Sequence, residues 1–103
     1  MSLSNTIKTL QSNIPANEEQ AQKFLDSLSQ ETQKQLIAAI YIGREHIHST
    51  VMREDMELDR SYTDNILKED YARIVYEKAG SLDLYFRKLE ECAKNSNFDI
   101  EEI

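Results

Sequence analysis

The most apolar stretch of the chain covers residues 36–42 and reads LIAAIYI. Apolar residues recur in it at intervals of three and four, which is the spacing of one helix face. The stripe is widened by further apolar residues beside it, and a helix apolar over so wide an arc is normally surrounded by other helices. We therefore expect residues 30–48 to form the central helix of an all-α domain, with Ser29 as its N-cap.

Gly43 lies inside this expected helix, where a glycine costs about 1 kcal/mol relative to alanine. Two explanations account for a glycine at this place. Either another helix approaches closely there, or the helix breaks there. The sequence leaves both open.

Helical spacing continues on the N-terminal side of this stretch. A short helix is expected over residues 4–12, and Pro15 prevents it from continuing. Asn17 is a good N-cap for the next helix, whose first turn carries Glu18 and Glu19 where the helix dipole favours acids.

On the C-terminal side, residues 48–60 are irregular and rich in acids, with apolar residues that a short helix could turn towards a core. A regular helix is expected from about Thr63 to Lys78, followed by Gly80 as a left-handed cap. Ser81 then caps a final helix. The apolar stripe of that helix consists of Leu82, Tyr85, Phe86, Leu89, Cys92 and Ala93.

These segments amount to four main helices plus one or two short ones, which predicts an antiparallel helical bundle. A length of 103 residues suffices for one domain, and two glycines and one proline are too few for the turns of a sandwich or barrel. We expect a single helical domain over residues 1–103. Its last stretch, residues 95–103, reads as a loosely attached acidic tail.

The charge and the apolar runs exclude several classes of partner. Twelve Lys and Arg against 19 Asp and Glu give a net charge of −7, which argues against binding of nucleic acid. No apolar run approaches the roughly 20 residues that cross a bilayer, and the N-terminus lacks the features of a signal peptide, so no membrane association is expected. The only cysteine, Cys92, cannot form an internal disulfide, which favours a cytoplasmic location.

His46 and His48 are the only histidines, and acids surround them, which raises the hypothesis of a divalent-metal site. Residues two apart on a helix point about 200° away from each other, whereas a helical pair sharing one metal is spaced by four. If the helix ended near Gly43 the two rings could converge, but no spacing marks a third ligand. We expect two surface imidazoles at a polar helix end, and whether they bind metal with nearby acids stays open.

No other constellation points to catalysis. Adjacent carboxylates fall opposite the apolar stripes and alternate with Lys and Arg, which indicates solvated helix faces. Cys92 lies on an apolar stripe, where a thiol behaves as a small buried hydrophobic group. The sequence therefore predicts no catalytic residue, no metal and no cofactor. Among the tyrosines, Tyr62 and Tyr76 are the ones most open to a role in binding a partner.

Residues 28–44 read LSQETQKQLIAAIYIGR, and residues 82–90 read LDLYFRKLE. In these two runs the chain resembles a small bacterial family, the domain of unknown function numbered three-seven-seven-five, over roughly residues 24–93. It departs from the family pattern at Tyr41, where the family has tryptophan, and before the last helix, where Gly80 and Ser81 replace a Gly/Pro-containing link. The segment between the two runs is also longer than in the family.

The resemblance implies a helical fold and a bacterial origin, and it adds no chemistry because the family has no known activity. The one residue it singles out is Arg44, which otherwise suits a helix-end cation. We take Arg44, Tyr62 and Tyr76 as the candidate interaction residues.

The leading functional hypothesis is a non-catalytic protein-interaction or regulatory module, able to self-associate as a homodimer, with a protein partner that the sequence does not identify. A second is an acidic inhibitor, of the kind phages encode, that occupies the nucleic-acid site of another protein. Complementary charge would speed the association of such an inhibitor with a basic target. The third, and weakest, is a metal-dependent hydrolase.

Overall fold

A computed structural model describes residues 2–103 of the chain. Over these residues the chain forms five α-helices, four short 3₁₀ turns and no β-strand, which confirms the all-α prediction. None of these helices has both the length and the apolar character needed to cross a membrane. The helices are α1 (Leu3–Ser12), α2 (Glu18–Asp26), α3 (Gln30–Glu45), α4 (Tyr71–Glu77) and α5 (Leu82–Asn95). The 3₁₀ turns lie at Thr63–Asn65, Lys68–Asp70, Ala79–Ser81 and Ile100–Glu102.

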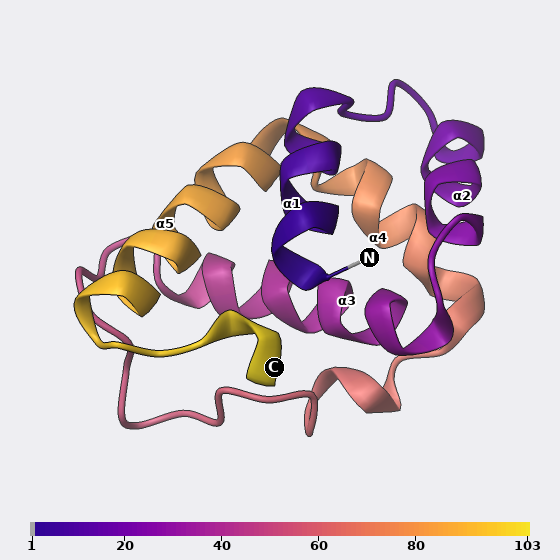
Figure 1. Cartoon of the computed structure of the whole chain (residues 1–103). Coiled ribbons are helices and arrows are strands. Elements are labelled where there is room, and N and C mark those ends of the chain that lie inside the picture. Colours follow the sequence, from indigo (N-terminus) through magenta and orange to yellow (C-terminus); the bar gives the residue numbers. More distant parts are fainter. Residues whose placement is uncertain (1) are drawn as a thin grey trace.

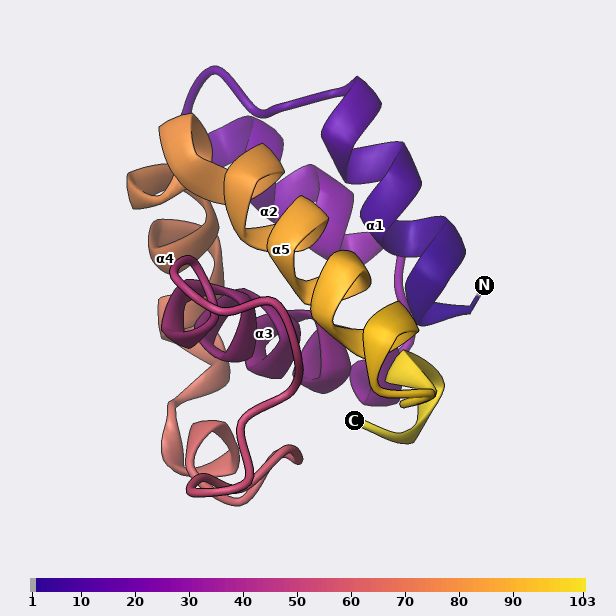
Figure 2. The same ribbon diagram turned by 90° about the vertical axis from the view of Figure 1, so that its left-hand side faces the viewer.

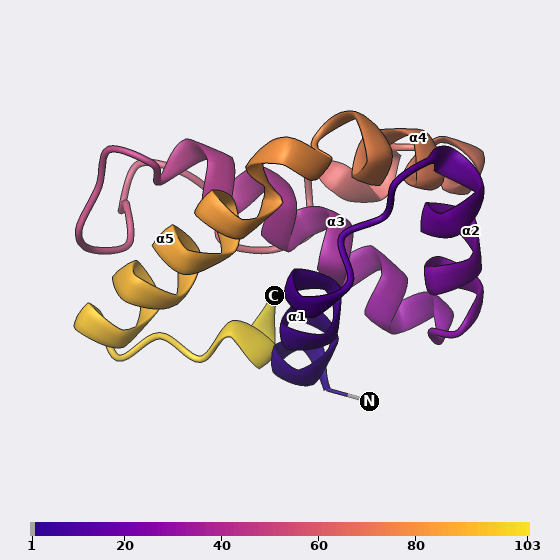
Figure 3. The same ribbon diagram turned by 90° about the horizontal axis from the view of Figure 1, so that it is seen from above.

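Helix α3 runs across the molecule (Figure 1), and α1 and α5 pack against it, while α2 and α4 pack against each other. Helices α5 and α1 pass over α3 (Figure 2), while α2 and α4 lie together near its N-terminal end (Figure 3). All five residues from 36 to 40 are fully buried. A helix buried on consecutive positions is enclosed on several sides, which confirms the central place predicted from the apolar stretch.

Two of the predicted helix starts are confirmed in detail. The side chains of Asn17 and Ser29 accept hydrogen bonds from the backbone N–H three residues further on, at 2.8 and 3.1 Å. Buried Gln33 adds a connection between neighbouring helices, because its amide donates to the carbonyl oxygens of Leu25 (2.9 Å) and Leu28 (3.2 Å). The Leu28 N–H also donates to the Leu25 carbonyl at 2.9 Å, so Gln33 adds a donor from α3 to the turn that follows α2.

At Gly43 the backbone of α5 approaches α3 closely. A Cβ atom on Gly43 would lie 2.9 Å from the carbonyl carbon of Tyr85 and 3.1 Å from its Cβ, and closer still to its carbonyl oxygen. Helix α3 continues past this point to Glu45. Of the two explanations for a glycine in this helix, close approach is therefore the correct one.

The prediction of one helix from Thr63 to Lys78 is wrong for its first half, because α4 begins only at Tyr71. Two 3₁₀ turns precede α4, and Ile66 and Leu67 between them have extended backbone angles. The polar side chains around them bond to nearby backbone groups, as when Asn65 donates to the carbonyl of Ser61 at 3.4 Å, and such bonds compete with the helix. Leu67, between the two turns, is 61% exposed.

The left-handed cap also lies elsewhere than predicted. Neither glycine has a positive φ, and Ser81 stands before α5 without capping it through its side chain. Among the described residues other than glycine, Asn97 alone has a positive φ, of 52°. This angle turns the chain back so that the amide of Phe98 donates to the carbonyl of Ala93 at 2.8 Å, which is the bond of a Schellman motif.

Past this turn, the C-terminal residues are packed, which corrects the expectation of a loosely attached tail. Ile100 and Ile103 are buried, and the amide of Gln35 donates to the carbonyl oxygen of Ile103 at 3.2 Å. The Glu101 carboxylate accepts the backbone N–H groups of Leu3 and Ser4, each at 2.9 Å. The tail thus supplies the cap for the N-terminus of α1, where amide donors lack helical partners.

Burial raises the pKa of Glu101, but the hydrogen bonds from Ser4 and Leu3 outweigh burial and hold the pKa below its ordinary value. A carboxylate whose pKa is lowered by folding stabilises the fold above its unfolded pKa. That contribution is lost as the pH falls through the folded pKa.

We predict that Gly43→Ala destabilises the protein by about 1–3 kcal/mol, because the added methyl group meets α5 backbone that cannot move aside like a side chain. Gly80→Ala is the matched control. Nothing lies within 4 Å of a Cβ there and φ is not positive, so it should be neutral or stabilise by up to about 1 kcal/mol. Urea unfolding measures both. Equal effects of the two substitutions would contradict the close packing of α3 on α5.

We predict that Glu101→Gln lowers the free energy of unfolding at neutral pH by about 1 kcal/mol, the usual value of an N-cap. The difference from the wild type should shrink below the ordinary glutamate pKa of about 4.3, because the wild-type carboxylate then becomes protonated as well. Glu102→Gln, at the exposed neighbouring residue, is the control and should show neither effect. A difference that does not depend on pH would refute the role of the Glu101 charge.

Candidate functional site

The segment 46–62 leaves the end of α3 and returns beneath it (Figure 1), without regular secondary structure. We call it the return loop. Its course depends on His46, which is fully buried. The Nε2 atom of His46 accepts the backbone N–H of Arg53 at 3.0 Å, and Nδ1 lies 2.7 Å from the carbonyl oxygen of Ile42.

These two contacts define the state of the His46 ring. Since Nε2 accepts a hydrogen bond it carries no proton, so Nδ1 carries it and donates to Ile42, and the imidazole is neutral. The Ile42 carbonyl belongs to the last turn of α3, where carbonyls lack helical partners. His46 therefore ends α3 and holds the return loop with one side chain.

The expectation of two surface imidazoles is thus wrong for His46, and the expected helix to residue 48 ends at Glu45. His48 is exposed, as expected. Within residues 2–103 no three His, Cys, Asp or Glu side chains come together in an arrangement that could hold a metal ion. The two histidines do not act as a pair, because one is committed to backbone contacts and the other faces solvent.

The C-terminal end of α5 holds the same loop from the other side. The side-chain amide of Asn95 donates to the carbonyl oxygen of Thr50, and the hydroxyl of Ser96 accepts the backbone N–H of Met52, both at 2.8 Å. Met52 itself is buried. The first half of the return loop is therefore hydrogen-bonded to His46 on one side and to the end of α5 on the other. These bonds fix the position from which the second half of the loop starts.

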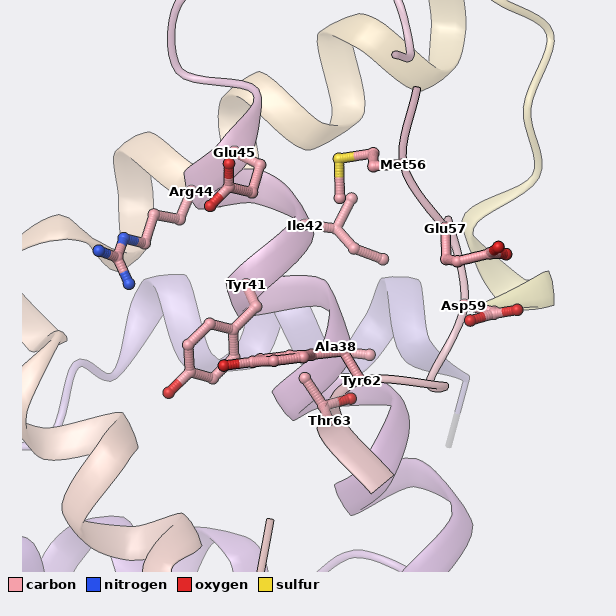
Figure 4. A pocket seen from close by; sticks show the side chains of 10 residues that line it. All are labelled: Ala38, Tyr41, Ile42, Arg44, Glu45, Met56, Glu57, Asp59, Tyr62 and Thr63. Atoms are coloured by element: carbon pink, nitrogen blue, oxygen red, sulfur yellow. The ribbon is translucent and has the colours of Figure 1, made fainter. Parts of the chain in front are cut away.

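Between α3 and the second half of the return loop lies a cavity of about 340 Å³ that is open on one side. This volume falls within the range of roughly 300–1,000 Å³ that is typical of ligand sites. Figure 4 shows the side chains around it, and we call it the loop cavity. Its lining residues are Ala38, Tyr41, Ile42, Arg44, Glu45, Met56, Glu57, Asp59, Tyr62 and Thr63.

The packing of Gly43 explains why this side of α3 lines a cavity. Helical residues advance by about 100° each, so Tyr41 and Glu45, two positions either side of Gly43, point about 200° away from it. Because Gly43 faces α5, these two residues face the return loop. Ala38 and Ile42 complete the same face and give the cavity an apolar floor.

An aromatic pair forms one wall of the cavity. The rings of Tyr41 and Tyr62 meet edge to face, with centroids 6.1 Å apart and an interplanar angle of 69°. The Nζ atom of Lys78 lies 5.2 Å from the centroid of the Tyr41 ring, a cation–π contact that holds this ring from the side of α4. Tyr62 is 73% exposed and offers an aromatic face to solvent.

The charged rim of the cavity is uneven. Glu45 pairs with Arg53 at 3.5 Å, whereas Glu57 and Asp59 have no cationic partner among residues 2–103. Hydrogen bonds from the side chain and backbone of Ser61 lower the pKa of Asp59, so its carboxylate is charged at neutral pH. Arg44 projects on the side away from Glu57 and Asp59 (Figure 4). In the same view the carboxylates of Glu57 and Asp59 point outward from the return loop, and Glu45 lies beside Arg44, so the rim carries charges of both signs.

Thr63 lines the same cavity and carries an unusual polar atom. The residue is 4% exposed, and its hydroxyl has no hydrogen-bond partner among the described residues. A buried hydroxyl without a partner costs about 1–3 kcal/mol, and few native side chains leave such a group unpaired. In Figure 4 Thr63 lies directly below the Tyr62 ring. The Thr63 hydroxyl is thus buried at the edge of the cavity without a partner.

Of the residues singled out from the sequence, Arg44 and Tyr62 line the loop cavity together. Tyr76 is 43% exposed on α4 and does not line it. Four further lining residues were not predicted from the sequence as site residues: Met56, Glu57, Asp59 and Thr63. The one signal for them was their place in an irregular acidic segment, which does not show that it folds back onto α3.

No family model, no curated protein and no solved structure matches this chain. The resemblance to the domain of unknown function numbered three-seven-seven-five stays a prediction.

We predict that His46→Ala lowers the free energy of unfolding by about 2–4 kcal/mol, because it leaves the amide of Arg53 and the carbonyl of Ile42 without partners. His48→Ala, at the exposed position, should stay within about 0.5 kcal/mol of the wild type. Urea unfolding of both variants provides the measurement. A tolerated His46→Ala would show that the return loop is not held by this ring.

Proposed function

We propose that this chain is an antiparallel helical bundle that acts as a non-catalytic protein-interaction module, and that the loop cavity is its binding site. The proposal rests above all on a cavity with an apolar floor and an exposed tyrosine, at whose edge the Thr63 hydroxyl is buried without a partner among the described residues. Such groups lower the stability of the free protein and gain a partner when a ligand binds. A cytoplasmic location belongs to the same proposal, because Cys92 is a free, buried thiol.

The composition of the cavity supports a protein partner. Tyrosine and methionine are enriched at interfaces, where they bury a large area, and an arginine at the rim supplies donors for carbonyl groups. Tyr62, Met56 and Arg44 provide these three elements around one concave surface. No convergent nucleophile or base lies among these lining side chains, so recognition rather than chemistry accounts best for the site.

The acidic-inhibitor hypothesis has weaker support. A protein that replaces nucleic acid needs a continuous acidic face, whereas α2, α4 and α5 each carry acids paired with cations. Examples are Lys23 with Glu19, Arg73 with Glu77 and Arg87 with Asp83. This alternation favours a module with one local site over an inhibitor that uses a whole face.

The test combines selection of peptides with one conservative substitution. Peptides selected from a random displayed library on the immobilised protein should shift backbone NMR signals in residues 38–45 and 56–63. Thr63→Val should weaken their binding about two- to tenfold, since it removes one hydrogen bond. The same substitution should not lower the free energy of unfolding, because the hydroxyl has no partner in the free protein.

Thr6→Val is the matched control. The buried Thr6 hydroxyl donates to the carbonyl of Ser2 at 2.8 Å, so this substitution should cost stability and leave peptide affinity unchanged. The proposal fails if the selected peptides bind Thr63→Val as tightly as the wild type. It also fails if their signals map away from the loop cavity.

A further inference from the structure

His46 holds the return loop by a hydrogen bond that only the neutral ring can make. Its Nε2 atom accepts the backbone N–H of Arg53 at 3.0 Å, while Nδ1 donates to the carbonyl of Ile42 at 2.7 Å. A protonated imidazole donates from both nitrogens, so a proton on Nε2 would set two N–H donors against each other. The ring is fully buried, so solvent does not reach either nitrogen while the loop stays in place.

The direction of the pH dependence follows from this geometry. With the loop in place the ring is neutral, whereas a ring released into water can bind a proton. The released state therefore binds more protons than the held state, so the held state is favoured at high pH and loses stability as the pH falls. Histidine is the side chain whose charge ordinarily changes between pH 5 and 8.

The return loop brings two charged groups to the ring, and they compensate each other. Asp55 interacts electrostatically with His46. The guanidinium of Arg53 pairs with Asp55 at 2.8 Å and with Glu45 of α3 at 3.5 Å. Its hydrogen bond holds the pKa of Asp55 below the ordinary value, so this carboxylate stays charged between pH 5 and 8. Because Arg53 already neutralises it, Asp55 does little to stabilise a protonated ring.

Helix α5 contributes no group that changes its charge in this range. Lys88, one turn beyond the contact of Tyr85 with Gly43, pairs with Glu91 at 3.0 Å. Burial raises the pKa of Cys92, which therefore stays a neutral thiol. Among the groups around the ring, His46 itself is thus the one that responds to mild acid.

The contacts of the loop decide which part of it moves when the Arg53 bond is lost. Thr50 and Met52 are held by Asn95 and Ser96 of α5 through bonds that involve no titratable group. The second half of the loop begins directly after Arg53 and forms the far wall of the loop cavity. Loss of the Arg53 bond therefore frees this wall and leaves the segment before it attached to α5.

We propose that protonation of His46 releases the return loop at Arg53 and opens the second wall of the loop cavity, which makes binding there sensitive to pH. The effect on binding rests on the proposed interaction function. The movement of the loop does not.

The test measures amide hydrogen exchange by NMR at pH 7.5 and pH 5.5, each compared with an unfolded chain at the same pH. We expect the protection of the Arg53 amide to fall about tenfold between the two, since a released histidine with the ordinary pKa of about 6.5 binds one proton over this range. Amides in the middle of α3 and α5 should keep their protection. The ¹⁵N shifts of the His46 ring report its protonation in the same samples.

Two variants assign the effect to His46. In His46→Gln the side-chain oxygen can still accept the Arg53 N–H and does not titrate, so protection there should be the same at both pH values, even if it is lower overall. His48→Ala is the control. It removes the exposed histidine and should keep the tenfold fall.

Equal protection of the wild-type Arg53 amide at both pH values would overturn the proposal, and so would a fall that persists in His46→Gln. A matching loss throughout α3 and α5 would also overturn it, because the proton would then act on the whole fold.

Binding separates this inference from the proposed function. The library peptides should bind more weakly at pH 5.5, by the factor that the measured open population predicts. If the loop opens as expected but no peptide binds at either pH, the interaction function is wrong and the loop movement stands. If peptides bind at the loop cavity and the Arg53 amide shows no pH dependence, the interaction function stands and the switch is wrong.

Discussion

The backbone contact between α3 and α5 at Gly43 sets the geometry on which the rest of the structure depends. Because no side chain separates the two helices there, α5 lies directly against the last turn of the central helix. That contact fixes the rotation of α3 about its own axis. One side of α3 packs against α5 and the core. The opposite side, which carries Tyr41 and Glu45, faces the return loop. The place of the cavity is thus a consequence of one missing Cβ atom.

Much of the helical core could be predicted because its causes are local. The apolar stretch 36–42 predicted the buried central helix, and Asn17 and Ser29 cap their helices as their residue types predict. The parts that were wrong depend on contacts distant in sequence. Glu101 caps a helix that begins 98 residues earlier, and no local pattern in the tail shows that partner. The left-handed turn is at Asn97 rather than Gly80, since asparagine also tolerates a positive φ and the tail turns there.

The candidate site likewise contains residues that the sequence could indicate and residues that it could not. Arg44 was singled out by the family resemblance and Tyr62 as a tyrosine open to binding a partner, and both line one cavity in the structure. Thr63 could not be singled out, because a threonine in a sequence gives no sign that its hydroxyl will be buried without a partner. His46 was misjudged because helical periodicity describes faces of a helix. It does not show a side chain that folds back over the helix end to hold a loop.

The central claim is that the return loop is a fixed wall of the molecule although it has no regular secondary structure. Amide hydrogen exchange, followed residue by residue by NMR, tests it most directly. The structure predicts that the amides of Met52 and Arg53, which donate to Ser96 and His46, exchange far more slowly than an unfolded chain, while their exposed neighbours exchange freely. Exchange of both amides at the rate of an unfolded chain would contradict the account, because the loop cavity would then have no second wall.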